Sequence, residues 1–339
     1  MRHVRIITGL WLGALVSCVA RQHPTTANGP VQSRMRADLA YLASPELEGR
    51  LTGTPGNDSA AVFIGRRYSD LGLAGAFDSA ECDKCLRSFY QEFQLSPYTL
   101  RRLLDVPHGH RTQNVGAIVN GTDSLLRHEY VIVGAHYDHI GRSGRYSLDG
   151  WVPGAIRPGA DDNASGTTAV LELARRFAGR PARRPILFAN FTAEELGMVG
   201  SQVFVANSPV PNNAVVAMVN LDMVGRLRGD KLIVLSGEDN GRLHAIVDSV
   251  DAISPAIQFK LQWQPASRAL SDYASFASVH IPVIGFFTDT HLDYHRTTDV
   301  VDRINFDGLE KIVDLTERVV RAVANGNGMP PRQPDKPTH

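Results

Sequence analysis

The sequence predicts an α/β protein in which a mainly parallel, mixed central sheet is flanked by helices on both faces. The chain has 339 residues and is 43% hydrophobic, which is enough for a sizeable buried core. Short apolar runs bounded by Gly and Pro recur from residue 114 onward, and segments with helical periodicity lie between them. Such apolar runs are typical of strands that are covered on both faces.

The individual elements follow in chain order. Residues 35–43 and the apolar stripe over 61–71, which Gly72 ends, predict two helices. The next apolar runs predict strands at 115–119, 130–135, 186–191, 215–223 and 232–235. Between the second and third of these strands, residues 164–177 predict a helix. Further elements are expected at 244–250, 282–287 and 306–323. No repeat and no Pro- or Ser-rich linker interrupts residues 35–325, which predicts a single domain.

Residues 1–18 predict a signal peptide of the lipoprotein type. Arg2 and Arg5 precede an apolar stretch that is too short to span a bilayer as a mature helix. The segment 15–18, Leu-Val-Ser-Cys, resembles the bacterial lipobox, in which the Cys (here Cys18) is lipidated; a plain cleavable signal peptide is the alternative. We expect an exported protein, either a lipoprotein on the periplasmic face of the envelope or a secreted one. Residues 19–34 are predicted as a spacer, and the Pro-rich residues 326–339 as a disordered tail.

Export also bears on Cys82 and Cys85, which lie three residues apart in a loop-like stretch. In an oxidising compartment a local disulfide is the favoured interpretation, with free thiols and a redox pair as alternatives. The 35 basic and 35 acidic residues balance, which gives no reason to expect a nucleic-acid partner. Membrane contact is expected only through a lipid at Cys18.

Five polar segments follow predicted strands or precede predicted helices. His136 and Asp138 end the strand at 130–135, and Asp161 and Asp162 precede the helix at 164–177. The others are Glu194 with Glu195, Asp222, and His295. Each alone has a common structural explanation, such as a helix cap or a solvated surface.

Together these segments bring two imidazoles and several carboxylates to the edge where open sheets build their sites. Nitrogen and oxygen ligands without thiolate favour zinc or a similar divalent ion. The sequence therefore predicts a metal centre, although periodicity does not decide which acid of each adjacent pair is the ligand.

The ordered motifs HYDH, GADDNASG, EELG, NLD and YH resemble those of the zinc aminopeptidases of metallopeptidase family M28, in clan MH. The resemblance covers residues 35–325, with no room for a protease-associated insert before HYDH. It implies a phosphorylase/hydrolase-like zinc-peptidase fold and an exported aminopeptidase that hydrolyses the N-terminal bond of peptides.

The resemblance also implies roles for single residues. His136, Asp161 and Asp222 hold one zinc ion, and Asp161, Glu195 and His295 hold the second, with Asp161 and a water bridging the two. Glu194 is the general base, and Tyr294 stabilises the oxyanion. Asp138 orients His136, while His139 is only a hydrogen-bonding neighbour.

Two other functions remain open at this point. A glutaminyl-cyclase-like acyltransferase with one zinc ion shares much of this ligand set. A noncatalytic, receptor-like ectodomain is the third possibility, although every expected ligand is present.

Overall fold

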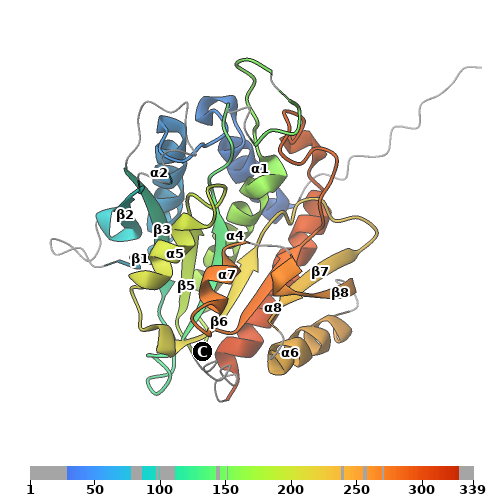
Figure 1. The fold of residues 1–339 in the computed structure, drawn as a ribbon. Helices are drawn as coiled ribbons and strands as arrows, with labels where there is room; N and C mark the ends of the chain where they lie inside the picture. The colour runs from blue at the N-terminus through green and yellow to red at the C-terminus, as the bar shows by residue number, and fades with distance from the viewer. Residues whose placement is uncertain are drawn as a thin grey trace, which may run out of the picture.

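A mixed sheet organises the fold (Figure 1). The computed structural model describes residues 29–77, 86–96, 99, 111–142, 146–150, 152–237, 240–254, 258–268 and 271–327. The predicted signal peptide with Cys18, the predicted Cys82–Cys85 disulfide and the tail from residue 328 lie outside the described residues.

The described residues form nine strands in the order β1-β3-β5-β4-β6-β9-β7-β8, with β2 also paired to β3. Their bounds are β1 Ala74–Gly75, β2 Tyr90–Gln94, β3 Arg111–Val119, β4 Tyr130–His136, β5 Ile186–Phe191, β6 Val215–Leu221, β7 Lys231–Ser236, β8 Lys260–Pro265 and β9 Val283–Phe287. The central strands β5, β4, β6 and β9 are parallel, and β3 and β7 flank them in the antiparallel sense. The predicted fold class, a mainly parallel mixed sheet, is confirmed.

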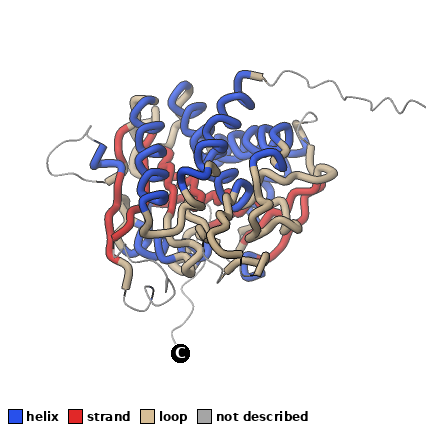
Figure 2. The backbone as a smooth tube through the Cα atoms, turned by 90° about the horizontal axis from the view of Figure 1, so that it is seen from above, coloured by secondary structure: helices blue, strands red, loops and turns tan. Residues whose placement is uncertain are grey.

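Helices cover both faces of the sheet, as Figure 2 shows from above. On one face lie α1 (Pro30–Leu42), α2 (Pro55–Asp70), α4 (Gly166–Gly179), α6 (Gly241–Ala252) and α8 (Phe306–Asn325), which share one large apolar cluster. The shorter α5 (Val199–Ala206) and α7 (Tyr273–Ala277) cover the other face with a second cluster. Every residue of β5 and β6 is buried, which explains why their sequences are continuous apolar runs.

Several boundaries differ from the predicted ones. Helix α1 begins at Pro30, inside the predicted spacer, because Pro is well tolerated in the first helical turn. The strand predicted over 215–223 ends at Leu221. Strands β1, β2 and β8 and helices α5 and α7 were not predicted, because they are short or expose polar residues. Among the helices that the structure describes, none is both long and apolar enough to cross a membrane.

Candidate metal centre

The carboxyl ends of the parallel strands bring most of the predicted site residues to one edge of the sheet. His136 is the last residue of β4, and Asp222 directly follows β6. Glu194 and Glu195 follow β5, and His295 lies in the loop between β9 and α8. The strands that carry these side chains are neighbours in the sheet, which is why residues far apart in the sequence meet here.

The remaining acid comes from the turn that enters α4. Residues Ala160–Ser165 form a single irregular turn, and the peptide bond between Asp162 and Asn163 is cis. Gly159, just before this turn, has φ +58°, and a Cβ there would lie 2.2 Å from the Asp162 carbonyl oxygen. A glycine is therefore required for the turn to fold back on itself.

Two groups of potential metal ligands share Asp162. In the first, His136 Nε2 lies 3.4 Å from Asp162 Oδ1 and 3.4 Å from Asp222 Oδ1. In the second, His295 Nε2 lies 3.1 Å from Asp162 Oδ2 and 3.2 Å from Glu195 Oε2. Asp162 directs one oxygen to each group, which is the arrangement of a carboxylate that can bridge two cations.

The structure corrects the choice between the two neighbouring aspartates. Asp161 lies in neither group, because its side chain points away: Oδ1 accepts a hydrogen bond from the Gly225 amide at 2.7 Å, and Oδ2 lies 3.0 Å from His291 Nε2. The place between the two groups, which the resemblance implies for Asp161, is taken by Asp162. Both acids are buried, so only the direction of the side chain separates them.

His139 belongs to the second group and is more than a peripheral neighbour. Its ring is fully buried, with Nδ1 at 2.7 Å from Glu195 Oε1 and 3.7 Å from Asp162 Oδ2. Its ring also meets that of His295 edge to face, with centroids 5.4 Å apart. The sequence feature that could have identified His139 is its place in the HYDH motif, three residues after His136.

Asp138 lies beside His136, as expected. Its Oδ1 is 3.6 Å from His136 Nδ1 and accepts a hydrogen bond from the Glu194 amide at 3.1 Å. Its Oδ2 accepts a hydrogen bond from the Thr52 hydroxyl at 2.9 Å. Asp138 therefore links the end of β4 to the segment that carries Glu194 and Glu195.

Two buried side chains that the sequence did not single out hold the backbone of the site. Arg50 is fully buried and donates hydrogen bonds to the carbonyls of Leu42, Tyr137, Pro158 and Gly159. The Asp299 carboxylate accepts hydrogen bonds from the amides of Asp161 and Asp162 at 2.9–3.1 Å. Arg50 lies in the upstream segment ELEGRLTGT, and Asp299 lies four residues beyond His295, but sequence alone gives neither contact.

Electrostatically, the site is a buried concentration of carboxylates. Burial, together with the charges of Glu195 and Asp272, raises the pKa of Glu194 well above its usual range, and His136 opposes this shift. Burial likewise raises the pKa of Asp272 to about 7. For Glu195 the effect of burial is outweighed by hydrogen bonds with His139 and His295, which hold its pKa low. Carboxylates buried at this density require compensating positive charge.

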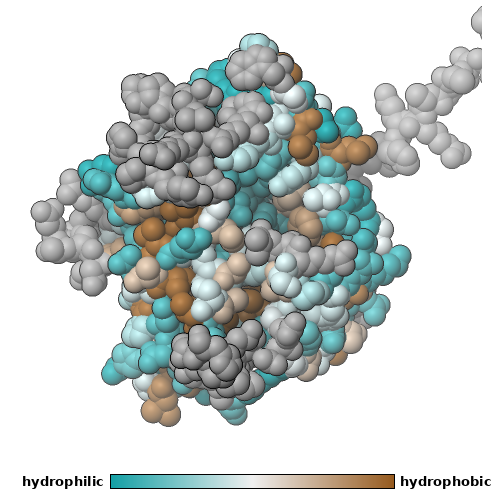
Figure 3. All heavy atoms as spheres, in the orientation of Figure 1, coloured by the Kyte–Doolittle hydropathy of each residue, from teal (hydrophilic) through white to brown (hydrophobic). Residues whose placement is uncertain are grey.

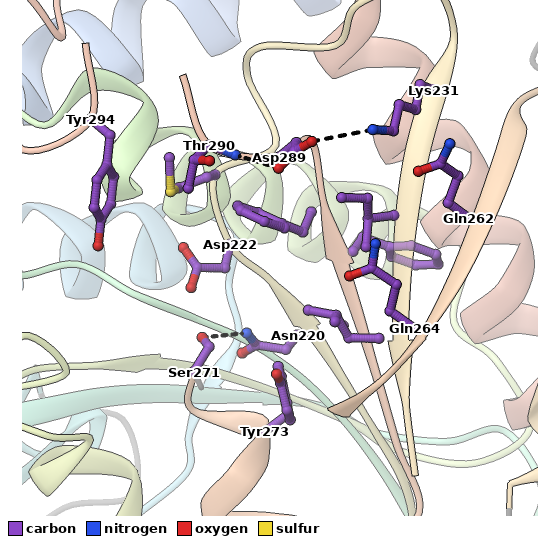
Figure 4. A pocket seen from close by; sticks show the side chains of 16 residues that line it. Asn220, Asp222, Lys231, Gln262, Gln264, Ser271, Tyr273, Asp289, Thr290 and Tyr294 are labelled. Atoms are coloured by element: carbon purple, nitrogen blue, oxygen red, sulfur yellow. Dashed lines mark hydrogen bonds and ion pairs between the residues drawn. The ribbon is translucent and has the colours of Figure 1, made fainter. Parts of the chain in front are cut away.

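Tyr294 lies at the border between the metal-ligand groups and a neighbouring pocket. Its ring stacks on the ring of His295, with centroids 3.9 Å apart. Figure 4 shows its phenol and the Asp222 carboxylate on the same side of that pocket. Burial raises the pKa of Tyr294, so its hydroxyl is neutral and able to donate a hydrogen bond.

The segment before α4 fixes the orientation of His295. His295 Nδ1 lies 2.9 Å from the Tyr146 carbonyl oxygen, and the Leu148 amide donates to the His295 carbonyl. Asp149 accepts a hydrogen bond from the Thr297 amide at 2.6 Å. The described part of the loop at 141–158 therefore packs against the His295 loop and turns Nε2 of this imidazole toward Asp162 and Glu195.

Among curated proteins, the chain is similar to fungal leucine aminopeptidases. It is 26% identical to leucine aminopeptidase 1 of Trichoderma harzianum over 57% of this chain and 51% of the relative. It is 31% identical to leucine aminopeptidase 1 of Arthroderma otae over 53% of this chain and 50% of the relative. The chain thus spans about half the length of these curated relatives.

Solved structures show the same fold. A leucine aminopeptidase precursor from Bacteroides thetaiotaomicron matches 86% of this chain and 96% of its own with a TM-score of 0.67 at 15% identity. A Zn-dependent exopeptidase from Parabacteroides distasonis matches 87% of this chain and 98% of its own, also with a TM-score of 0.67, at 19% identity. A sequence model of peptidase family M28 matches residues 114–320, more than half of the chain and every predicted ligand. The chain therefore belongs to peptidase family M28.

Proposed function

We propose that the protein is a zinc-dependent aminopeptidase with two adjacent metal sites that share Asp162. The observation that carries this proposal is the pair of ligand groups, His136–Asp162–Asp222 and His139–Asp162–Glu195–His295, with Glu194 beside them. Membership of family M28 and the names of the relatives point to the same activity.

The residues of both groups fit zinc. Imidazole nitrogens and carboxylate oxygens are ligands that zinc accepts, and no thiolate lies among them. Asp222 Oδ1, which faces the first group, is buried and has no hydrogen-bond partner among the described residues. We propose that His136, Asp162 and Asp222 hold one ion, and that Asp162, Glu195 and His295 hold the other. His139 supports the second site through its contact with Glu195.

Bound zinc would supply positive charge that polarises the scissile carbonyl and lowers the pKa of the attacking water. Glu194 is the general base: it takes the proton of that water and passes it to the leaving amine. Asp138 holds the Glu194 backbone and the His136 ring in a fixed relation. The neutral Tyr294 hydroxyl donates a hydrogen bond to the oxyanion of the tetrahedral intermediate.

We also propose that the protein is exported, on the basis of residues 1–18 alone. Lipid at Cys18 would anchor it to the envelope. Mass spectrometry of the mature N-terminus in the membrane fraction tests this, because a chain that starts beyond Cys18 without lipid excludes the anchor.

Metal analysis combined with peptidase assays tests the proposed activity. We expect two zinc ions per chain and hydrolysis of aminoacyl p-nitroanilides that a chelator abolishes and zinc restores. Amino-blocked substrates should not be cleaved. Glu194→Gln should lose at least about a hundredfold in kcat, the lower range for a general base, while it keeps both ions.

Two results would contradict the proposal. One zinc ion per chain, with cyclisation of N-terminal glutamine and no peptide hydrolysis, would support the glutaminyl-cyclase-like acyltransferase instead. A chain that binds no metal and cleaves nothing would support the receptor-like alternative.

A further inference from the structure

A pocket of about 680 Å³ opens beside Asp222 and Tyr294. It extends from the end of β6 across β9 and β7 to the edge strand β8 (Figure 4). Interstrand spacing of about 4.8 Å places β8 roughly 14 Å from β6. The pocket is therefore deeper than a small side chain needs, and it leads away from the proposed catalytic groups.

The pocket has an apolar floor and a polar far wall. Ile233 and Leu235 of β7 line the floor, and both are buried. In the parallel register of β7 and β8, Ile233 pairs with Gln262 and Leu235 with Gln264. Paired residues of adjacent strands share a face, so the two glutamines continue the surface that Ile233 and Leu235 begin.

The two glutamine amides are available for a ligand. Figure 4 shows Gln262 and Gln264 extending from β8 on the side of the pocket opposite to Tyr294. Neither side chain is hydrogen-bonded to another residue of the described part of the chain. Each amide can both donate and accept a hydrogen bond.

The charged residues of the pocket wall neutralise each other. Lys231 Nζ lies 3.2 Å from Asp289 Oδ2, and both side chains are about 40% exposed. Among the described lining residues, the far end of the pocket therefore offers neutral hydrogen-bonding groups and no unpaired charge, while Asp222, a proposed metal ligand, lies at the near end.

From this arrangement we infer that Gln262 and Gln264 determine specificity for the first residue of the substrate. They favour a long side chain with an apolar stem and an uncharged hydrogen-bonding end, as in glutamine and tyrosine. The stem packs on Ile233 and Leu235, and the polar end bonds to the β8 amides. This inference rests on the proposed aminopeptidase activity, because the amino-terminal residue is placed with its scissile bond beside Asp222.

Matched substrate pairs test the inference. Glutaminyl and methionyl p-nitroanilides have similar length, and tyrosyl and phenylalanyl p-nitroanilides differ by one hydroxyl. We expect wild type to prefer the polar member of at least one pair in kcat/KM. Gln262→Met or Gln264→Met should lower that preference about threefold to tenfold, the size expected for one neutral hydrogen bond, while hydrolysis of the apolar member is unchanged or rises.

Gln258→Met provides the matched control, because Gln258 is exposed just before β8 and lies outside the pocket. The inference is overturned if wild type cleaves the panel without preferring either polar member. It is also overturned if the preference survives in both pocket variants or falls equally in the control. Absence of cleavage for every substrate by zinc-loaded wild type would instead refute the proposed function, and the inference with it.

Discussion

At the scale of single residues, Asp161 and Asp162 have the same chemistry and the same burial but different neighbours. Asp162 faces the imidazoles of His136 and His295, whereas Asp161 accepts a hydrogen bond from the Gly225 amide and contacts His291. Asp161 therefore ties the turn before α4 to the segments after β6 and β9. In the proposed metal centre, Asp161 positions the turn and Asp162 binds metal.

Replacement of each aspartate by asparagine should separate these two functions. Asp162→Asn removes the charge that both ligand groups share, so zinc bound per chain should fall from two to one or none, with loss of activity. Asp161→Asn keeps an acceptor for Gly225, so we expect both ions to remain and the free energy of unfolding to fall by about 1–3 kcal/mol. Metal analysis after dialysis and denaturant titration measure both effects. Loss of zinc in Asp161→Asn with full retention in Asp162→Asn would reverse the assignment.

The sequence predicted the composition of the site better than its geometry. His136, Glu195, Asp222 and His295 lie at or beyond the carboxyl ends of the parallel strands of the sheet, and the order of these strands brings such residues together. The choice within the pair 161–162 depends on the irregular turn, whose backbone angles have no signal in residue periodicity. Arg50 acts through carbonyl groups that any sequence would supply, so its contacts could not be read from residue types.

At the scale of elements, α4 and α8 are joined by ion pairs as well as by apolar packing. Arg176 of α4 contacts Asp314 and Glu317 of α8, at 2.5 and 3.1 Å. Glu317 also pairs with Arg321 one turn further along α8, at 2.7 Å. Because α4 begins at the turn that carries Asp162, this network helps to fix the helix that supports the site.

Glu317→Gln should reveal the contribution of this network through its pH dependence. Burial raises the pKa of Glu317, but hydrogen bonds with Arg321 and Arg176 outweigh it and lower the pKa. A carboxyl whose folded pKa is depressed contributes stability above its unfolded pKa, about 4.3, and loses it as the pH falls through the folded pKa. We expect the variant to be about 0.5–1 kcal/mol less stable than wild type at pH 7.

Denaturant titrations of wild type and Glu317→Gln at several pH values between 7 and 3 measure this difference. The gap should close as the pH falls below 4. Glu310→Gln, on the same helix but outside the Arg176 network, is the matched control and should show no comparable trend. A gap that stays constant down to pH 3 would mean that packing, and not charge, explains the effect.

The central strands that the sequence predicted are buried along almost their whole length. Strands β4, β5 and β6 are almost entirely buried, and their apolar runs are correspondingly continuous. Strand β8 alternates between Leu261 and Trp263, which are partly buried, and the glutamines of the pocket. The polar face of β8 lines the pocket and does not pack in the core. Its sequence therefore lacks the continuous apolar run that is typical of a buried strand.

At the scale of the whole molecule, acidic and basic residues balance, but several of the acidic ones are buried together at the site. The face in Figure 3 mixes hydrophilic and hydrophobic side chains, whereas the site gathers buried carboxylates from four segments of the chain. These segments are the turn before α4 and the residues that follow β4, β5 and β6. Since the ligands come from so many elements, metal binding should stabilise the fold as a unit.

Zinc should therefore raise the thermal unfolding temperature in proportion to the logarithm of its free concentration above Kd. A ligand that binds only the folded state adds about 2.7 kcal/mol per site at a hundredfold excess over Kd. We expect a rise of several degrees in chelator-treated wild type and in Glu194→Gln, which keeps all proposed ligands. In Asp162→Asn, which lacks the shared carboxylate, most of this rise should disappear. Differential scanning calorimetry across a buffered zinc series measures it, and an equal rise in Asp162→Asn and wild type would show that zinc stabilises the protein from somewhere other than this centre.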